Sequence, residues 1–459
     1  MALIGIDIGT TSICGLLIDS VTGGLYKALS RPNTAALPSA QPWEWLQDPE
    51  RIWQTVKYIV DELAGTRTDI RAIGVTGQMH GIVYVDDAGQ AVSPLYTWQD
   101  QRGELPAGNG QTYASKLSSM TGYRLATGYG AVTHYYLAVN GQIPESAAAL
   151  CTIGDFVAMK LAGLNRPVTD ATHAAGLGLF RLDRLQFDEP AAALAGLPGT
   201  MLPQVVASGT VIGATASGIP VVCALGDNQA SFLGTVRHVE QTALANIGTG
   251  SQLSAYSAVL PELPQQLEAR PFPGGGYLLV GAGLSGGKSY ELLEQFFREV
   301  CRLFTGVEPG SLYERMNELS AQAWEAMNPA HGGLQVNTQF YGTRHHAEQL
   351  GSIERISPAN FKPQHLIKGF MQGMIAELLA FKAAFPHGLQ ASWKELRGSG
   401  NGIRRNPALQ RMLSESFGLP LAISEHDEEA AYGAALCAGA GCGVFGDFLH
   451  IGFVHKKER

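Results

Sequence analysis

The strongest constraint on the fold is a five-residue motif that occurs twice, about half a chain length apart. Residues 8–12 read Ile-Gly-Thr-Thr-Ser and residues 247–251 read Ile-Gly-Thr-Gly-Ser, so four of the five positions are identical. An apolar run typical of a buried strand leads into each copy, from Leu3 to Ile8 and from Thr242 to Ile247. A repeat with this spacing predicts two similar domains, each built around a β-hairpin with a Gly-Thr turn.

The residue types in these turns suit phosphate. Glycine lets the backbone come close to a ligand, and threonine hydroxyls and turn amides can donate to phosphate oxygens. Asp7, beside the first turn, is placed to hold a hydrated cation. An ordinary hairpin explains one copy equally well, and it is the repeat that favours phosphate binding at both. The predicted phosphate-binding residues are Gly9, Thr10, Thr11, Gly248, Thr249 and Gly250.

Composition limits the class of protein and its partners. A chain of 459 residues is long for one core, which agrees with two domains. Charged residues are only 16% and glycines number 56, as in a loop-rich α/β enzyme. A net charge of −8 attracts no polyanion, so no nucleic-acid partner is expected. Six cysteines without CxxC spacing, no basic leader and no apolar stretch approaching ~18 residues predict a cytoplasmic protein with no membrane partner.

Polar residues that could bind sugar hydroxyls follow two apolar runs. The strand predicted over 71–75 leads to Gly-Gln-Met-His-Gly at 77–81, and α/β sheets place ligands at such strand ends. The second run leads to Trp98, Asp100 and Arg102, where an indole can stack on a sugar and a carboxylate can accept from hydroxyls. Core packing of Trp98 and a local ion pair between Asp100 and Arg102 are simpler alternatives, and both stay open.

A third candidate is the carboxylate of Asp227. The continuous apolar run 220–225 predicts a buried strand, and Gly-Asp-Asn-Gln follows it directly. Asp227 could act there as a general base, or it could cap a helix over 228–233.

The remaining apolar spacings predict helices. One helix is expected to begin at Asp48-Pro49, and three others are expected over 289–304, 365–381 and 406–417. The glycine-rich entry at 281–288 could hold phosphate but lacks the context of a dinucleotide site. A small-residue helix over 427–436 could leave a flat slot for an adenine ring beside the glycine loop at 398–402, or could simply pack tightly.

The order of these motifs resembles the FGGY carbohydrate kinases across essentially the whole chain. The resemblance rests on residues 7–11, 77–81, 226–229, 247–250 and 398–400. It implies an α/β fold of two ribonuclease-H-like domains, of the actin and hexokinase type, with a central cleft for nucleotide and sugar. By this analogy the N-terminal domain spans 1–237 and the C-terminal domain spans 238–459.

The resemblance also implies the chemistry and the cofactors, ATP and Mg²⁺. Asp227 would accept the proton of a terminal sugar hydroxyl, whose oxygen attacks the γ-phosphate, while Asp7 holds Mg²⁺ through water. The implied sugar ligands are Gln78, Met79, His80, Trp98, Asp100 and Asp227. The implied adenosine-side ligands are Gly398, Ser399, Gly400 and Asn401.

Three further stretches narrow the implied substrate within the family. Residues 97–100, residues 126–130, and residues 398–400 followed by Arg405-Asn406 are together more similar to kinases of a seven-carbon ketose than to those of a five-carbon one. At 341–345 the family commonly has Gly-Glu-Arg, whereas here Thr343 replaces the acid and Arg344 and His345 remain.

Two other classes of protein compete with a sugar kinase. A sensor that binds sugar and nucleotide without turnover would not need both Asp7 and Asp227. A chaperone-type ATPase would not need the sugar ligands at 78–80 and 98–100. The expected partners are small molecules, sugar and ATP, and the sequence leaves open whether the chain forms a homodimer.

Overall fold

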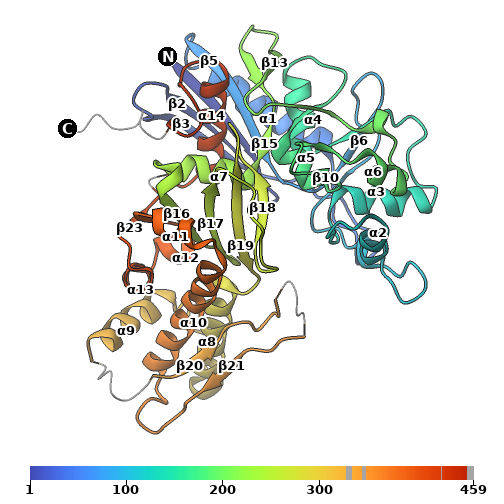
Figure 1. The fold of residues 1–459 in the computed structure, drawn as a ribbon. Coiled ribbons are helices and arrows are strands. Elements are labelled where there is room, and N and C mark those ends of the chain that lie inside the picture. The colour runs from blue at the N-terminus through green and yellow to red at the C-terminus, as the bar shows by residue number, and fades with distance from the viewer. Residues whose placement is uncertain (327–332, 344–347, 425, 452–459) are drawn as a thin grey trace. The chain divides into compact units, whose positions relative to one another are not determined.

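The computed structural model describes residues 1–326, 333–343, 348–424 and 426–451 (Figure 1). The chain forms two compact units: unit 1 comprises 1–239, 270–277 and 426–459, and unit 2 comprises 240–269 and 278–425. This division differs from two continuous ranges split at 237/238, because the last helix and a short segment near 270 belong to unit 1. In the part of the chain that the structure describes, no helix is long and apolar enough to cross a membrane.

Unit 1 is built on a sheet that the first hairpin starts, as predicted. Strands β1 (Ala2–Ile8) and β2 (Ser12–Asp19) are antiparallel, and β1 runs parallel to β5 (Ile70–Gly77). The strand order is β13-β14-β5-β1-β2-β3, and β15 also pairs with β5. The other strands of this sheet are β3 (Leu25–Pro32), β13 (Val211–Ala214), β14 (Pro220–Val222) and β15 (Leu225–Gly226).

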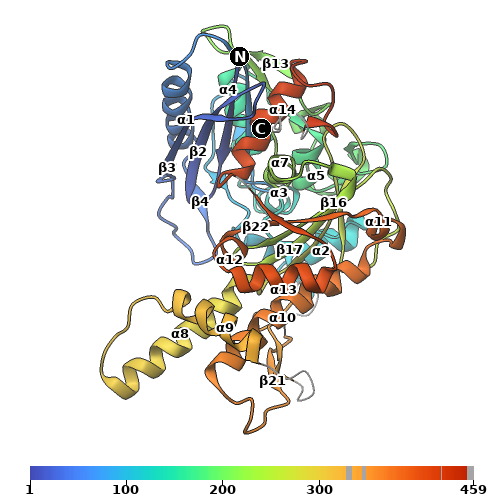
Figure 2. The same ribbon diagram turned by 90° about the vertical axis from the view of Figure 1, so that its left-hand side faces the viewer.

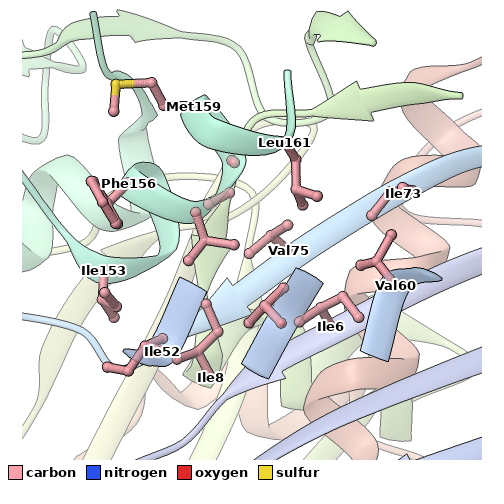
Figure 3. Close-up of a cluster of buried hydrophobic side chains, with 14 of the residues drawn as sticks. Ile6, Ile8, Ile52, Val60, Ile73, Val75, Ile153, Phe156, Met159 and Leu161 are labelled. Atoms are coloured by element: carbon pink, nitrogen blue, oxygen red, sulfur yellow. The ribbon is translucent and has the colours of Figure 1, made fainter. Parts of the chain in front are cut away.

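The alternation of side chains along β1 explains how both faces of this sheet are covered. Ile6 and Ile8 point to one face, where they pack with α1 (Pro49–Ala64) and α4 (Ile153–Leu161) in a buried apolar cluster (Figure 3). Leu3 points to the other face and packs against α14 (Glu429–Gly441). The predicted start of α1 is confirmed, since the Asp48 side chain accepts hydrogen bonds from two backbone amides of its first turn.

Shorter elements surround this core in unit 1. They include a second apolar cluster around the fully buried Tyr84. The elements are β4 (Leu46–Gln47), β6 (Val83–Val85), β7 (Leu95–Tyr96), η1 (Arg102–Glu104), α2 (Tyr113–Thr121), α3 (Gly130–Val139), β8 (Ala149–Cys151), β9 (Val168–Asp170), α5 (Ala171–Leu177), β10 (Phe180–Arg181), β11 (Gln186–Phe187), α6 (Glu189–Leu194), η2 (Gly199–Met201), β12 (Gln204–Val206) and α7 (Asp227–Thr235).

Unit 2 repeats the strand plan of unit 1, which confirms the internal duplication. Its strand order is β18-β19-β17-β16-β22-β23, with β16 antiparallel to β17 and parallel to β22. The order β19-β17-β16-β22-β23 matches β3-β2-β1-β5-β14, with β18 added beyond β19, and this is the ribonuclease-H-like arrangement. The strands are β16 (Thr242–Ile247), β17 (Ser251–Ser257), β18 (Glu268–Pro271), β19 (Tyr277–Gly283), β22 (Glu395–Ser399) and β23 (Leu421–Ile423).

The predicted helices of unit 2 are present. Helix α10 lies along the sheet and packs against β17 and α13 (Figure 2). The remaining elements of the unit are η3 (Val239–Gln241), α8 (Gly286–Thr305), α9 (Tyr313–Ala326), β20 (Gln335–Asn337), β21 (Ser352–Glu354), α10 (Pro363–Ala384), α11 (His387–Ser392), α12 (Asn401–Arg404) and α13 (Pro407–Phe417).

Helix α14 lies unusually close to the sheet of unit 1. A Cβ atom on Gly5 or on Gly74 would stand 1.9 Å from a backbone oxygen of α14, and one on Gly433 would stand 1.8 Å from Ala230 O of α7. Glycine is therefore required at 5 and 74 on the sheet and at 433 on α14. Tight packing, one of the two alternatives for the small-residue helix, is present on the side of α14 that faces the sheet and α7.

Candidate active site

The sheet of unit 1 brings Asp7 and Asp227 to one edge. Asp7 on β1 pairs in register with Thr76 on β5, and Thr76 in turn pairs with Leu225 on β15. Asp227 follows two residues later, at the carboxyl end where α/β sheets bind ligands. It is the first residue of α7, whose N-cap is Gly226 with no side-chain capping bond. The alternative role of Asp227 as a helix cap is therefore wrong.

The charges at this edge are unbalanced. Burial, then Asp227, then Glu428 raise the pKa of Asp7 to about 8. Burial likewise raises the pKa of Asp227 to about 6, although the Arg270 guanidinium and the Asn228 amide act in the opposite direction. Because nearby carboxylates disfavour one another's ionised form, a cation bound beside them would be stabilised. Within the described residues, no group of three or more His, Cys, Asp or Glu side chains is arranged to hold a metal ion directly.

Hydrogen bonds to its carbonyl oxygens fix the backbone of the first Gly-Thr turn. Asn33 Nδ2 donates to Gly9 O at 2.9 Å and Asn33 N donates to Thr11 O at 2.9 Å. Gln47 Nε2 donates to Thr10 O at 3.1 Å. The amides of Thr10 and Thr11 have no acceptor among the residues that the structure describes. The turn thus presents donors outward, as a phosphate-binding turn requires.

The second turn is held in the same way by the start of α8. Gly287 N donates to Gly248 O at 2.9 Å and Lys288 N donates to Thr249 O at 3.0 Å. A Cβ on Gly287 would lie 2.1 Å from Gly248 O, so the contact needs glycine. The glycine-rich entry at 281–288 therefore supports the turn, and these two amides of α8 are used in doing so.

The predicted adenosine-side loop lies beside the second turn within unit 2. Ser399 pairs with Asn246 across β22 and β16, and Asn246 Nδ2 donates to Ser399 Oγ at 2.7 Å. Gly400 has φ of 82°, and a Cβ there would lie 2.6 Å from Ile247 O. Residues 398–401 and 248–250 thus form one cluster of backbone turns.

Of the predicted sugar ligands at 78–80, Gln78 is linked to the first turn and His80 is held by α5. The buried Gln78 donates from Nε2 to Gln47 Oε1 at 2.9 Å, and Gln47 in turn holds Thr10. His80 has φ of 73°, which is uncommon for a residue with a side chain. Its Nδ1 donates to Gly176 O at 2.7 Å, because a carbonyl can only accept. This bond fixes the tautomer of His80 and the direction of its ring.

Trp98 is not a core residue, since 47% of it is exposed. Its Nε1 donates to Thr10 Oγ1 at 3.1 Å, so the indole touches the first phosphate turn. Nearly half of the Trp98 side chain thus remains exposed next to that turn.

Asp100 and Met79 support the site from within. Asp100 is fully buried; its Oδ1 accepts from Arg102 N and Nε, and its Oδ2 accepts from an Arg102 terminal nitrogen and from Trp45 N. Four donors occupy the acceptor positions of this carboxylate, so the local ion pair is present and no position is left for a sugar. Met79 is 5% exposed and packs against Gly226.

Some residues of these sites were not singled out from the sequence. Glu428, which raises the pKa of Asp7, lies at the start of α14. Acidic residues are common at helix starts, so its position in the sequence was little reason to assign it to a site. Arg270 had no signal. Glu377 is 8% exposed on α10 and accepts a hydrogen bond from Ser251 Oγ, directly after the second turn. Arg344 and His345 lie outside the described residues, and the structure assigns no role to Thr343.

The fold and these sites define a phosphotransferase built on two ribonuclease-H-like cores. Residues 2–234 match the N-terminal domain of the FGGY family of carbohydrate kinases, and the chain belongs to this family. It is therefore an enzyme that transfers a phosphoryl group from ATP to a sugar hydroxyl.

Known relatives agree with this assignment. The chain is 30% identical to a sedoheptulokinase of Mus musculus, over 94% of this chain and 96% of the relative. It is 24% identical to a xylulose kinase of Lactococcus lactis, over 99% of this chain and 91% of the relative. The crystal structure of xylulose kinase from Rhodospirillum rubrum matches the fold with a TM-score of 0.84 and 20% identity, covering 98% of this chain and 92% of that one.

Proposed function

We propose that this kinase phosphorylates the terminal hydroxyl of a ketose, and that sedoheptulose is the substrate, giving sedoheptulose 7-phosphate. The observation that carries the proposal is the exposed Trp98 indole, whose Nε1 donates to Thr10 of the first phosphate turn. Together with His80 and Gln78 it provides a sugar site beside that turn. The similarity to sedoheptulokinases favours the seven-carbon ketose, and xylulose is the alternative.

Asp227 is proposed as the general base. A pKa of about 6 leaves its carboxylate mostly ionised at neutral pH and still near the range in which a base works best. It would accept the proton of the terminal hydroxyl as the oxygen attacks the γ-phosphate. The amides of Thr10 and Thr11 in the first turn, and the second turn at 248–250, would donate to the phosphate oxygens. Residues 398–401 would contact the adenosine.

Asp7 is proposed to hold Mg²⁺ through water. The residues fit a hydrated cation, because Asp7, Asp227 and Glu428 gather negative charge that raises the pKa of Asp7. A bound Mg²⁺ would supply neutralisation of the phosphate charge. In the sugar site we assign direct contacts to Gln78, His80 and Trp98, with Met79 and Asp100 as supports.

The test is a coupled ADP-release assay with MgATP and a panel of acceptors. Sedoheptulose is expected to give the highest kcat/KM among sedoheptulose, D-xylulose, D-ribulose, L-ribulose and glycerol. A preference for xylulose would replace the proposed substrate, and equal turnover without any sugar would refute the proposal.

The same assay tests the base. Asp227→Asn keeps the size of the side chain, and general-base help is typically worth roughly 10²–10⁴-fold, so kcat should fall by about that factor. Near-normal turnover of this variant would remove Asp227 from the mechanism.

A further inference from the structure

The peptide group that joins Leu225 to Gly226, one position before the peptide that leads into Asp227, is held at both of its polar ends by threonine hydroxyls. Thr76 Oγ1 donates to Leu225 O at 2.7 Å, and Thr172 Oγ1 accepts from Gly226 N at 2.7 Å. This carbonyl and this amide belong to the same planar peptide group, so its rotation is fixed from two sides. Both threonines are fully buried, which protects the two bonds from competition by water.

A buried carboxylate sets the direction of one of these hydroxyls. Thr172 Oγ1 donates its single proton to Asp170 Oδ1 at 2.6 Å, which leaves only lone pairs to face Gly226 N. Asp170 also accepts from Thr172 N and His173 N at 3.0 Å each and from Ser208 Oγ at 2.6 Å. Three of these four bonds cap the start of α5 and the fourth ties Asp170 to Ser208, while the bond from Gly226 N to Thr172 Oγ1 joins this start to β15.

Helix α7 packs tightly against α14, where a Cβ on Gly433 would stand 1.8 Å from Ala230 O, so the position of Asp227 depends both on this packing and on the turn that begins the helix. The helix that it starts has Gly226 as its N-cap and makes no side-chain capping bond. The strand before it, β15, has two residues and pairs with β5 only at Leu225 and Gly226. The direction in which the Asp227 carboxylate leaves the sheet therefore depends on how the Leu225–Gly226 peptide is held.

We propose that Thr172, oriented by Asp170, and Thr76 are positioning residues that aim Asp227 at the sugar hydroxyl; this inference rests on the proposed role of Asp227 as base. Loss of either hydroxyl would let the peptide group turn and displace the carboxylate. A misplacement of about 1 Å can cost roughly 10²-fold in rate. The proposed sugar contacts Gln78, His80 and Trp98 hydrogen-bond to Gln47, Gly176 and Thr10 and not to either threonine, so binding should be kept while turnover falls.

The first test is Thr172→Val, which keeps the shape of the side chain and removes the hydroxyl. We expect kcat to fall by about 10–100-fold while KM for sugar and for ATP stays within about 3-fold. Thr172→Ser restores the hydroxyl and should recover most of kcat. Thr76→Val tests the other end of the same peptide group and should lower kcat in the same way.

The control variant is Thr152→Val, because Thr152 makes the same pattern of bonds elsewhere in unit 1. Thr152 is also fully buried, and its Oγ1 donates to Asp155 Oδ2 at 2.8 Å and accepts from Asp155 N at 3.1 Å. It should lower the thermal midpoint about as much as Thr172→Val while leaving kcat unchanged. Equal loss of kcat in this control would show that the effect is general destabilisation and would overturn the proposal.

A double-mutant cycle with Asp227→Asn separates this inference from the proposed function. If Thr172 acts through Asp227, adding Thr172→Val to Asp227→Asn should lower kcat no further. A full additional loss would overturn the positioning role, as would unchanged kcat in both Thr172→Val and Thr76→Val. If Asp227→Asn itself keeps normal turnover, the base is wrongly assigned and the positioning role fails with it.

Discussion

Replacing Gly74 with alanine should destabilise unit 1 by separating β5 from α14. The new Cβ would stand 1.9 Å from Ala434 O and 3.2 Å from Ala438 Cβ. Ordinary contacts begin near 3.4 Å, so the helix must retreat by about 1.5 Å, the difference between 3.4 and 1.9. A gap of 0.5–1 Å already removes roughly a quarter to a half of the dispersion energy at a contact. We therefore expect a loss of about 3 kcal/mol, the upper part of the range for overpacked cores.

Urea unfolding followed by tryptophan fluorescence measures this loss, since unit 1 contains four of the six tryptophans, at positions 43, 45, 53 and 98. The control is Gly199→Ala, also in unit 1, because a Cβ there meets no atom within 4 Å. The control should change the free energy of unfolding by no more than about 0.5 kcal/mol. The same small change for Gly74→Ala would show that α14 does not press on β5 at this position.

Two further predictions concern buried carboxylates. Burial raises the pKa of Asp155 to about 7, above its unfolded value of 3.8, so the unfolding free energy should fall as pH rises from about 4 to 7 and then level off. Asp155→Asn lacks this loss, so the difference in unfolding free energy between variant and wild type, measured at pH 5 and at pH 8, should grow with pH by up to about 1.4 kcal/mol per unit; a constant difference would contradict the prediction. Arg102→Met should cost about 3–5 kcal/mol in chemical denaturation, because Asp100 would keep a buried charge without its partner. Unchanged stability would mean that Asp100 can take up a proton or water at little cost.

The parts of the fold that depend on neighbouring residues could be predicted from the sequence. Alternating apolar residues and a Gly-Thr turn specify each hairpin locally, and the second copy of the motif revealed the duplication. The start of α1 at Asp48 was equally local, since one side chain caps the helix. The order of strands in each sheet, by contrast, became an expectation only through the resemblance to a family.

The rest could not be predicted because it depends on residues far apart in the chain. The position of α14 requires glycine at 5, 74 and 433, each against a backbone oxygen of a distant element, and no local pattern marks these glycines among the 56 of the chain. The ion pair of Asp100 with Arg102 was one of two alternatives that the sequence left open, but the amide of Trp45, 55 residues away, also donates to Asp100 and could not be predicted. Thr172 lies in a polar turn that carries no sequence motif. Its proposed role follows only from the hydrogen bond that its hydroxyl accepts from Gly226 of β15, which pairs with β5.

Helix α14 belongs to unit 1 although it lies near the end of the chain, and this affects folding during synthesis. A ribosome releases β1 and β5 hundreds of residues before Glu429, so Leu3, Leu16 and Ala72 stay without the helix that later buries them. The nascent chain must carry this apolar surface while all of unit 2 is synthesised. Chaperone binding to the early sheet, and aggregation of chains that stop short of Glu429, are the natural consequences, and a fragment cut at 234 would inherit the same exposed face.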